Sequence, residues 1–207
     1  MITCLTITGK KYQQFEARNK KCRDWQTVPH HSLVYQDEFG PSGSVGGLRN
    51  AAIRHHAPSD TDYIAHFDVD DISAPNRLAV QLAHIQKTGK LVTGLYDCPM
   101  YDVKHDKVWI YDNPRHSPYA VGCSLFYKRE AWEKHKFPDR TPEDNLWRNA
   151  VGGENIESRS VWENGKPLMI QVIHGGNASA SIVRSSVYYK EPSEAQEKAV
   201  RELLQSA

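Results

Sequence analysis

The sequence predicts an α/β fold with a mostly parallel central sheet flanked by helices, and three observations lead to that prediction. Short runs of β-branched and aromatic residues alternate with amphipathic stretches along the chain. Several of these runs end in glycine or acidic residues, as strands commonly do. No proline- or serine-rich linker interrupts the 207 residues, a length that suits one well-packed domain. Such strand–helix–strand repetition is typical of a parallel sheet with helices on its faces.

The first part of the chain contains three predicted strands separated by helices. The pattern is clearest at the start, where an apolar run ends at Thr8 and Gly9 and a helical spacing of apolar residues follows. In order, the expected elements are a strand over 2–7, a helix that contains 12–22, a strand over 32–35, a helix over 46–56 and a strand over 63–67.

The second part of the chain predicts shorter strands and ends in a helix. Its tail alternates charged residues with Ala and Leu, which predicts an amphipathic C-terminal helix. In order, the expected elements are a helix after Pro75, strands over 91–96, 107–111 and 121–127, helices over 129–136 and 143–151, a strand over 168–173 and a helix over 193–205.

The composition is that of a soluble globular protein and limits the classes of function. Hydrophobic residues make up 39% and charged residues 25% of the chain. The formal net charge of +1 gives no global electrostatic reason to expect nucleic-acid binding. The longest apolar stretches are too short for a membrane span, and the N-terminus lacks the charged start of a secretory signal. We therefore expect a cytoplasmic protein.

The four cysteines are scattered through the sequence without a CxxC pair, so they indicate neither a zinc knuckle nor a redox motif. Free cysteine behaves as a small hydrophobic residue. We therefore expect four reduced and mostly buried thiols, at Cys4, Cys22, Cys98 and Cys123.

The most informative segment is the acidic group Asp68, Asp70 and Asp71, which directly follows the apolar run 63–67. Three like charges at the carboxyl end of a buried strand repel one another unless a cation, ligand hydroxyls or water compensates them. Hard divalent cations prefer carboxylate oxygens, so the group predicts a site for Mn²⁺ or Mg²⁺. The alternative is a solvated turn that begins the helix near Pro75.

Four segments of the chain carry a pattern when they are taken in order. They are Gly46–Ile53, Tyr63–Asp71 with Pro75, Val121–Trp132 and Pro142–Asp144. Their order resembles the family 2 glycosyltransferases of the GT-A fold, a Rossmann-like architecture. The resemblance spans residues 2–177, and the compact size is similar to that of some phage-encoded members. It implies a single GT-A domain over 1–207, with a nucleotide-binding half (1–72), an acceptor and catalytic half (73–180) and a C-terminal tail and helix (181–207).

The resemblance implies roles for the acidic group. Asp68 and Asp70 match the DxD pair of the family, in which one carboxylate reaches the donor ribose or the metal and the other binds the metal. The metal, Mn²⁺ or Mg²⁺, stabilises the charge that develops on a nucleoside diphosphate leaving group. Arg49 would assist on the donor side, and its alternative is a surface salt bridge or a helix cap.

The resemblance also implies a general base. Glu143-Asp144 matches the ED motif, in which Asp144 takes the proton of the acceptor hydroxyl and Glu143 precedes it in the catalytic pair. A partly buried carboxylate suits this role because desolvation raises its basicity. The same residues, after Thr141 and Pro142, also form a good helix start, and the two interpretations are compatible.

The nucleotide base would bind at the ends of the first and second strands, with Thr8 at the first and Gln36 or Asp37 at the second. Here the chain departs from the family, which carries a Thr-Tyr-Asn-like run and an Asp-Asp-Gly-Ser run where this chain has Thr6–Lys10 and Gln36–Gly40. The departure leaves the identity of the base open. The Asp37 carboxylate would accept a hydrogen bond from a base imide nitrogen.

His174 follows the last predicted strand, at a place where some GT-A enzymes carry a metal-binding or phosphate-contacting histidine. The glycines after it would permit close backbone approach to a phosphate. The alternative is a structural loop histidine. Four tryptophans are either core residues or a platform for sugar stacking, namely Trp109, Trp132, Trp147 and Trp162.

These expectations combine into one hypothesis. The chain would be a metal-dependent, inverting glycosyltransferase that moves a hexosyl or pentosyl group from a nucleotide-sugar donor to a hydroxyl acceptor on a polysaccharide, lipid carrier, protein or modified DNA base. For DNA, the sequence offers a basic segment with Lys10, Lys11, Lys20, Lys21 and Arg23. The alternatives are a nucleotidyltransferase and a non-catalytic nucleotide-sugar-binding module.

Overall fold

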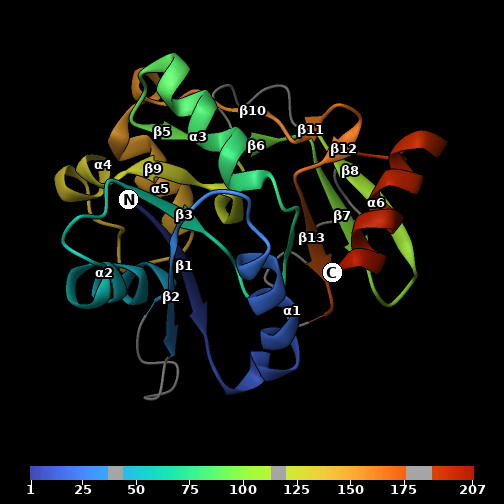
Figure 1. Cartoon of the computed structure of the whole chain (residues 1–207), viewed down its shortest axis with the longest axis horizontal. Helices are drawn as coiled ribbons and strands as arrows, with labels where there is room; N and C mark the ends of the chain where they lie inside the picture. Colours follow the sequence, from blue (N-terminus) through green and yellow to red (C-terminus); the bar gives the residue numbers. More distant parts are fainter. Residues whose placement is uncertain (37–43, 113–119, 176–187) are drawn as a thin grey trace.

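The computed structural model describes residues 1–36, 44–112, 120–175 and 188–207, and it contains two main sheets surrounded by helices (Figure 1). The first sheet has the strand order β2-β1-β3-β9-β5. Strands β1, β2 and β3 run parallel, whereas β9 is antiparallel to both β3 and β5. Strands from both sides of residue 72 share this sheet, which supports our proposal of a single domain. The sheet consists of β1 (Ile2–Thr8), β2 (His31–Gln36), β3 (Tyr63–His66), β5 (Val92–Thr93) and β9 (Phe126–Lys128).

Alternation along the strands of the first sheet divides the hydrophobic core between its two faces. On β1, Leu5 packs into one core cluster and Cys4 into the other, as the period of two in a strand requires. Full burial of an aliphatic side chain such as Leu5 contributes about 1.5–3 kcal/mol. The Leu5 face is covered by α2 (Val45–His56), α4 (Arg129–Lys134) and α5 (Glu143–Val151), and the Cys4 face by α3 (Arg77–Thr88).

The second sheet has the order β14-β8-β7-β13-β4 and is mainly antiparallel, with β7 and β13 as its parallel pair. Cys22 of α1 and Val200 of α6 share a core cluster with Ile170 and Val172 of β13. Helices α1 and α6 therefore cover the same side of this sheet. The elements are β4 (Ile72–Ser73), β7 (Cys98–Asp102), β8 (Lys107–Tyr111), β13 (Met169–Ile173), β14 (Tyr189–Lys190), α1 (Gln13–Asp24) and α6 (Glu194–Ser206).

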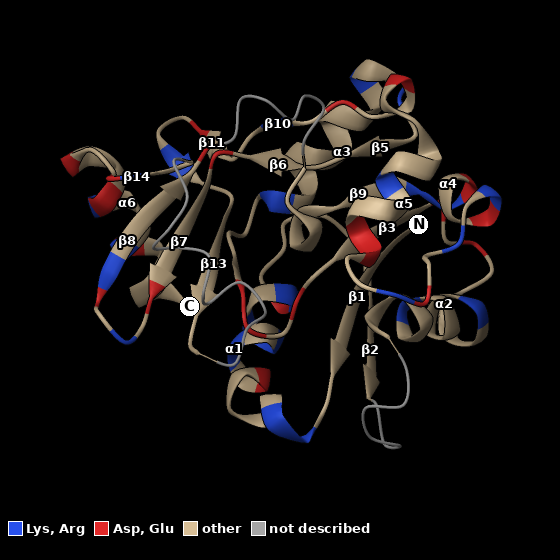
Figure 2. Cartoon of the chain, turned by 180° about the vertical axis from the view of Figure 1, so that it is seen from behind, with Lys and Arg blue, Asp and Glu red and all other residues tan. Residues whose placement is uncertain are grey.

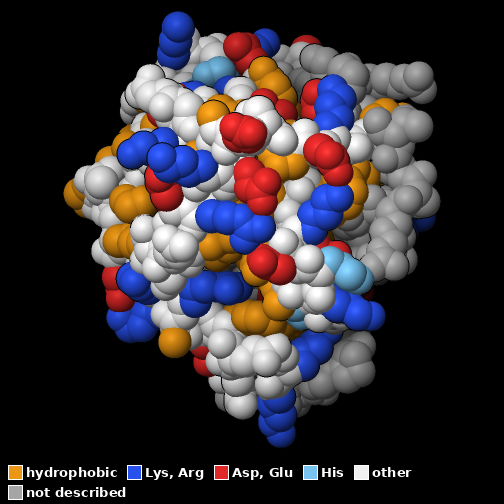
Figure 3. Space-filling view, turned by 90° about the vertical axis from the view of Figure 1, so that its right-hand side faces the viewer, with side chains coloured by type: hydrophobic (Ala, Val, Ile, Leu, Met, Phe, Trp, Pro, Cys, Tyr) orange, Lys and Arg blue, Asp and Glu red, His pale blue; other side chains and the backbone are white. Residues whose placement is uncertain are grey.

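Helix α6 is the amphipathic C-terminal helix that the sequence predicts. It begins with a capping box, in which Ser193 Oγ accepts from the Gln196 backbone N–H and Gln196 Oε1 accepts from the Ser193 backbone N–H. Figure 3 shows the face of the molecule on this side, where positive and negative side chains are interleaved. Arg201 on α6, for example, pairs with both Glu197 and Asp106. Neither α6 nor any other helix within the described residues is long and apolar enough to cross a membrane.

Two predicted strands differ from the structure, and several strands were not predicted, of which β7 is the longest. The run 91–96 is divided at Gly94 into β5 and β6, which belong to different sheets. The run 121–127 begins with a 3-10 turn, in which the Ser124 backbone N–H donates to the Val121 carbonyl oxygen at 2.8 Å and Ser124 Oγ donates to the same oxygen at 2.6 Å. Strand β7 was missed because Pro99, which has no N–H, lowers strand propensity. The short elements are β6 (Leu95–Tyr96), β10 (Arg159–Ser160), β11 (Trp162–Glu163), β12 (Lys166–Pro167), η1 (Lys10–Tyr12), η2 (Gly122–Ser124) and η3 (Gly153–Asn155).

All four cysteines are buried and free, as the sequence predicts. Burial raises the pKa of the Cys4 thiol to about 12, and it also raises the pKa of the Cys22 thiol. The thiols therefore act as small core side chains that stay protonated at neutral pH.

Candidate functional site

The acidic loop, defined as residues 68–71, follows the carboxyl end of β3, as the sequence predicts. A cavity of about 250 Å³ opens beside it. The acidic loop lines this cavity together with Ile7 of β1, Arg49 of α2, Glu143 of α5 and Ile173 of β13. Ligands of open α/β sheets commonly bind at the carboxyl ends of the strands, and the cavity is in that position.

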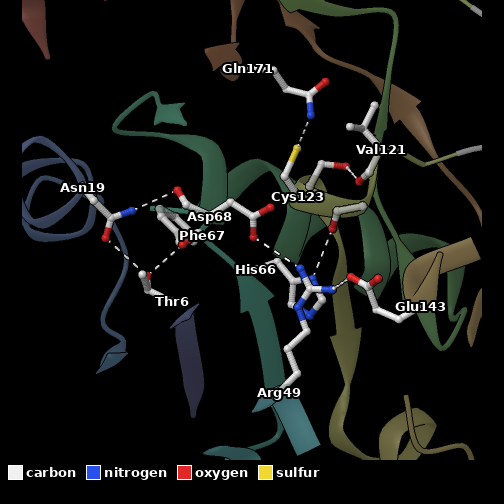
Figure 4. A network of polar contacts seen from close by, with 12 residues as sticks. Thr6, Asn19, Arg49, His66, Phe67, Asp68, Val121, Cys123, Glu143 and Gln171 are labelled. Atoms are coloured by element: carbon white, nitrogen blue, oxygen red, sulfur yellow. Dashed lines mark hydrogen bonds and ion pairs between the residues drawn. The ribbon is translucent and has the colours of Figure 1, made fainter. Parts of the chain in front are cut away.

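Helix α1 holds the backbone of the acidic loop in place. Asn19 Nδ2 donates to the Asp68 carbonyl oxygen at 3.1 Å, and Arg18 Nη2 donates to the Asp70 carbonyl oxygen at 2.6 Å. Thr6 Oγ1 of β1 donates to the Phe67 carbonyl oxygen at 2.8 Å (Figure 4). The sequence reasoning missed Arg18 and Asn19, because nothing in a helix sequence reveals which distant loop its polar side chains contact.

Arg49 lies between the two acidic parts of the site (Figure 4). Its Nη1 donates to Glu143 Oε1 at 2.8 Å, and its Nη2 is 3.4 Å from Asp68 Oδ1. The Arg49 side chain is only 6% exposed, so the interpretation as a surface salt bridge is wrong. Burial opposes its charge, but the carboxylates of Asp68, Glu143 and Asp144 together raise the pKa of the guanidinium. Arg49 therefore joins the predicted donor and acceptor sides as a permanent cation.

The carboxylates of the acidic loop carry an electrostatic penalty. Burial is the main reason that the pKa of Asp68 is raised; Arg49 opposes the shift, whereas Asp70, Glu143 and Asp144 add to it. Burial likewise raises the pKa of Asp71 well above its usual range, and Asp70 and Asp68 add to that shift. A cation placed among these groups would relieve the repulsion.

Asp71 lines the cavity, but its carboxylate is also held by hydrogen bonds within the protein. Its Oδ1 accepts from the Val172 backbone N–H at 3.1 Å, and it accepts a hydrogen bond from the Cys123 thiol. Potential ligand atoms of Asp68, Asp71 and Cys123 all lie within 4.8 Å of one another. Because the pKa of Cys123 is raised well above its usual range, mainly by burial, its sulfur is a thiol and not a thiolate. Asp71 thus connects the acidic loop to β13.

Asp70 and His174 meet at the open side of the acidic loop. His174 Nε2 is 3.0 Å from Asp70 Oδ2, and the His174 ring packs against Phe15 of α1 with centroids 4.5 Å apart. The side chains of Asp70 and His174 are 16% and 13% exposed. The structure therefore brings together two of the three predicted metal ligands, while the third, Asp68, points toward Arg49.

Asp144 lies in the first turn of α5, where it rests on Gly122. A Cβ atom built on Gly122 would be 2.0 Å from Asp144 Oδ2, so only glycine permits this contact. Glu143, the preceding residue, faces Arg49 and lines the cavity. The helix-start and site interpretations of Glu143 and Asp144 are thus compatible in the structure. Gly122 was not singled out from the sequence, although it lies in the third family-like segment.

The structure describes Thr8 and Gln36, but not Asp37, among the residues predicted to bind the nucleotide base. Thr8 is buried at the end of β1, and its Oγ1 donates to Glu16 Oε1 of α1 at 2.9 Å. The Thr8 hydroxyl is thus engaged within the protein. Asp37 lies outside the described residues, and Gln36 is the last residue of β2.

Two of the four tryptophans, and part of the basic segment, are not available for binding. Trp132 and Trp147 are buried in the core on the Leu5 face of the first sheet. Arg23 is also buried, and Lys20 pairs with Asp24 one helical turn away. Both findings reduce the surface that these side chains offer to a sugar or to DNA.

Comparisons with known proteins identify the fold. No family model and no curated protein matches the sequence. Among solved structures, TarS 1–349 of S. aureus in complex with UDP matches with a TM-score of 0.63 and 14% identity, over 83% of this chain and 60% of that chain. The mannosyltransferase PcManGT from Pyrobaculum calidifontis, in complex with GDP-Man and Mn²⁺, matches with a TM-score of 0.62 and 14% identity, over 88% of this chain and 60% of that chain.

A third solved structure is closer to this chain in length. It is a glycosyltransferase involved in the glycosylation of the major capsid of PBCV-1, with a TM-score of 0.52 and 11% identity, over 87% of this chain and 96% of that chain. The match spans less than two thirds of the TarS and mannosyltransferase chains. At such identities the similarity establishes architecture: the chain has the GT-A fold of glycosyltransferases.

Proposed function

We propose that the chain is a metal-dependent, inverting glycosyltransferase that moves a sugar from a nucleotide-sugar donor to a hydroxyl acceptor. One observation carries the proposal: the acidic loop and the start of α5 face each other across one cavity, and Arg49 contacts both. α5 contributes Glu143 to the lining of this cavity, and Asp144 is the next residue. This arrangement supports a proposal in which a metal and donor site and a general base, the two parts that this chemistry needs, come from segments far apart in the sequence.

The residues fit a divalent cation. Asp70 Oδ2 and His174 Nε2 are 3.0 Å apart. Neighbouring ligands of an octahedral ion with bond lengths of about 2.1 Å are separated by about 3.0 Å. Asp70 and His174 would hold Mn²⁺ or Mg²⁺, and Asp68, which points toward Arg49, is proposed as a further ligand. The cation would stabilise the negative charge of the leaving nucleoside diphosphate. The neighbour that was solved with GDP-Man and Mn²⁺ supports this choice of donor and metal classes.

Asp144 is the proposed general base. Its carboxylate would accept the proton of the acceptor hydroxyl while that oxygen forms a bond to the anomeric carbon of the sugar. The bond between the anomeric carbon and the diphosphate oxygen breaks on the opposite face, and its electron pair leaves with the diphosphate. This single displacement inverts the anomeric centre. Glu143 would keep Arg49 charged and in place between the donor and the base.

The hydroxyl acceptor is proposed as a class that comprises polysaccharides, lipid carriers, proteins and modified DNA bases. For DNA, the exposed basic side chains near the N-terminus are Lys10, Lys11, Lys20 and Lys21, of which Lys20 pairs with Asp24. Figure 2 shows acidic residues close to the basic ones on α1. Binding to duplex DNA that carries hydroxymethylated bases, measured at two salt concentrations, tests this acceptor. Loss of binding at high salt would support DNA, whereas no binding at low salt would exclude it.

The experiment that tests the function measures the release of nucleoside diphosphate. The protein is incubated with Mn²⁺ and a panel of uridine, guanosine, adenosine and thymidine diphosphate sugars. We expect one donor to give release that Asp70→Asn and Asp144→Asn abolish, while Asp60→Asn, a change at an exposed loop position, leaves release unchanged. Binding of the donor should survive in Asp144→Asn and fail in Asp70→Asn.

Three results would contradict the proposal. Equal release of nucleoside diphosphate by wild type and Asp70→Asn would contradict the assignment of Asp70 as a ligand of a metal that the reaction needs. Metal-dependent donor binding without release from any donor would favour a non-catalytic nucleotide-sugar-binding module. Release of pyrophosphate from a nucleoside triphosphate in the presence of a sugar phosphate would instead indicate a nucleotidyltransferase. Lys10 and Lys11, the basic residues that such an enzyme would use at its first loop, are not among the residues that line the cavity.

A further inference from the structure

A buried histidine lies beneath the general base that the proposed function assigns. His66 is the last residue of β3 and is 1% exposed. Its Nδ1 is 3.1 Å from the Gly122 carbonyl oxygen, and its Nε2 is 3.1 Å from the Tyr127 hydroxyl oxygen. A carbonyl oxygen only accepts, so Nδ1 carries the hydrogen and Nε2 accepts from Tyr127. The imidazole is therefore fully satisfied as a neutral ring.

Gly122 is the surface on which Asp144 rests. Its α-carbon is so close to Asp144 that an added Cβ would lie 2.0 Å from Oδ2 and 2.8 Å from Cγ of that side chain. The Gly122 carbonyl oxygen also accepts from the Leu125 backbone N–H, at a longer 3.3 Å. The His66 contact is thus the shorter of the two hydrogen bonds that orient this peptide group. If it were lost, a largely buried carbonyl would lose a partner and the peptide could rotate.

His66 is also connected to the helix that carries Asp144. Tyr127, its second partner, packs against Trp147 of α5 with ring centroids 4.8 Å apart. Trp147 lies in the turn that follows Asp144 and is fully buried. The imidazole therefore touches both the peptide under the carboxylate and the packing that supports the start of α5.

We propose that His66 is a positioning residue for Asp144: its Nδ1–H fixes the Gly122 peptide, which in turn fixes the direction of the Asp144 carboxylate. This inference rests on the proposed function, because it assigns His66 a part in setting the general base. His66 is buried and is not among the residues that line the cavity beside the acidic loop. In this proposal the hydrogen bond to Gly122, and not the one to Tyr127, directs the Asp144 carboxylate.

Two substitutions separate the two hydrogen bonds of the imidazole. In His66→Asn, the amide nitrogen takes the place of Nδ1, so the bond to Gly122 is kept and the bond to Tyr127 is lost. In His66→Gln, the longer side chain reaches the place of Nε2, so the bond to Tyr127 is kept and the bond to Gly122 is lost. The double variant His66→Asn with Tyr127→Phe removes the unpaired hydroxyl that the first substitution would leave buried.

We expect His66→Gln and His66→Asn to differ in turnover. With the active nucleotide-sugar and Mn²⁺, His66→Gln should lower kcat for nucleoside diphosphate release about tenfold or more, because a misdirected base loses at least about one factor of ten in transition-state stabilisation. His66→Asn and its double variant should keep most of the turnover. KM for the donor should be unchanged in all three variants, and thermal unfolding should identify any variant that is merely unstable.

Crystal structures of the same variants give a second readout that needs no turnover. The contact between Asp144 and Gly122 should be kept in His66→Asn and lost or shifted in His66→Gln. The inference is overturned if His66→Gln keeps the contact and full turnover, or if both variants lose turnover in proportion to their loss of stability. If wild type releases nucleoside diphosphate from no donor, the proposed function fails, and the structures still decide whether His66 directs the carboxylate.

Discussion

Arg49 Nη1 and Glu143 Oε1 are 2.8 Å apart although the two residues are separated by 94 positions in the sequence. The pair joins α2 to the start of α5, and the same guanidinium reaches Asp68 after β3. A charge buried to this degree is stable only because carboxylates surround it. Loss of the Arg49 charge would therefore disturb both Asp68 and Glu143.

Replacement of Arg49 should lower the stability of the folded protein as well as its transferase activity. Arg49→Met leaves Glu143 and Asp68 without their shared partner, and breaking a buried ion pair of this kind costs about 3 kcal/mol. Arg49→Lys should cost less, because it keeps the charge but cannot contact two carboxylates with a planar fork. Chemical denaturation measures the free energy of unfolding. Arg54→Met, at an exposed position of the same helix, is the control, and an equal loss in both variants would contradict the role of Arg49.

Gly122→Ala should impair catalysis with little effect on folding. The new methyl group would displace the Asp144 carboxylate, which can rotate away, while the Asp144 Cβ, 3.1 Å from the added atom, would have to shift by only a few tenths of an ångström. Removal of a positioned general base costs about a hundredfold or more, so kcat should fall by about that factor. Steady-state kinetics and thermal unfolding measure the two effects. Gly9→Ala is the matched control, because a Cβ at Gly9 meets no atom within 4 Å. Full turnover in Gly122→Ala would mean that the position of the Asp144 carboxylate does not matter for catalysis, which contradicts its role as general base.

Removal of divalent metal should lower stability in a way that depends on Asp70. A ligand that binds only the folded state at a concentration of 100 Kd stabilises it by about 2.7 kcal/mol, so added Mn²⁺ should raise the melting temperature and a chelator should reverse the shift. The shift should be absent in Asp70→Asn and reduced in His174→Ala. An unchanged Mn²⁺ shift in Asp70→Asn would place the cation elsewhere.

The buried thiol of Cys4 should make stability fall at alkaline pH. Its pKa is raised from 9.0 to about 12 in the folded protein, mainly by burial. Below pH 9 the thiol is protonated in both the folded and unfolded states, so its contribution is fully present there. Between pH 9 and 12 only the unfolded chain releases this proton, and the free energy of unfolding falls by about 1.4 kcal/mol per pH unit.

The measurement for Cys4 compares wild type with Cys4→Ala under reducing conditions. Denaturation curves recorded from pH 7 to 10.5 should show a steeper decline for wild type than for the variant. Lysines and tyrosines titrate equally in both proteins, so they cancel in the comparison. Parallel pH profiles would mean that the Cys4 thiol is as accessible to ionisation in the folded state as in the unfolded state.

The local pattern of the sequence predicted most of the helices and strands. The apolar runs that became β1, β2 and β3 each carry the alternation or aliphatic content of a strand, and α2, α3 and α6 carry helical spacing. Where the prediction was wrong, long-range contacts had decided the outcome. The run 91–96 has the aliphatic, β-branched and aromatic content of a strand, yet its two ends pair with different partners, β9 and β10, and so belong to different sheets.

By itself, the sequence determined the strand that carries the acidic loop, the presence of three carboxylates after it and the helix start that presents Asp144, since these depend on neighbouring residues. Only the tertiary structure decided how the side chains are used. It turned Asp71 inward to Val172, placed Arg49 between Asp68 and Glu143, and set His66 and Gly122 beneath Asp144. The physical reason is that burial and hydrogen bonding between distant segments exist only after the chain has packed, whereas helical and strand periodicity is already present in the unfolded chain.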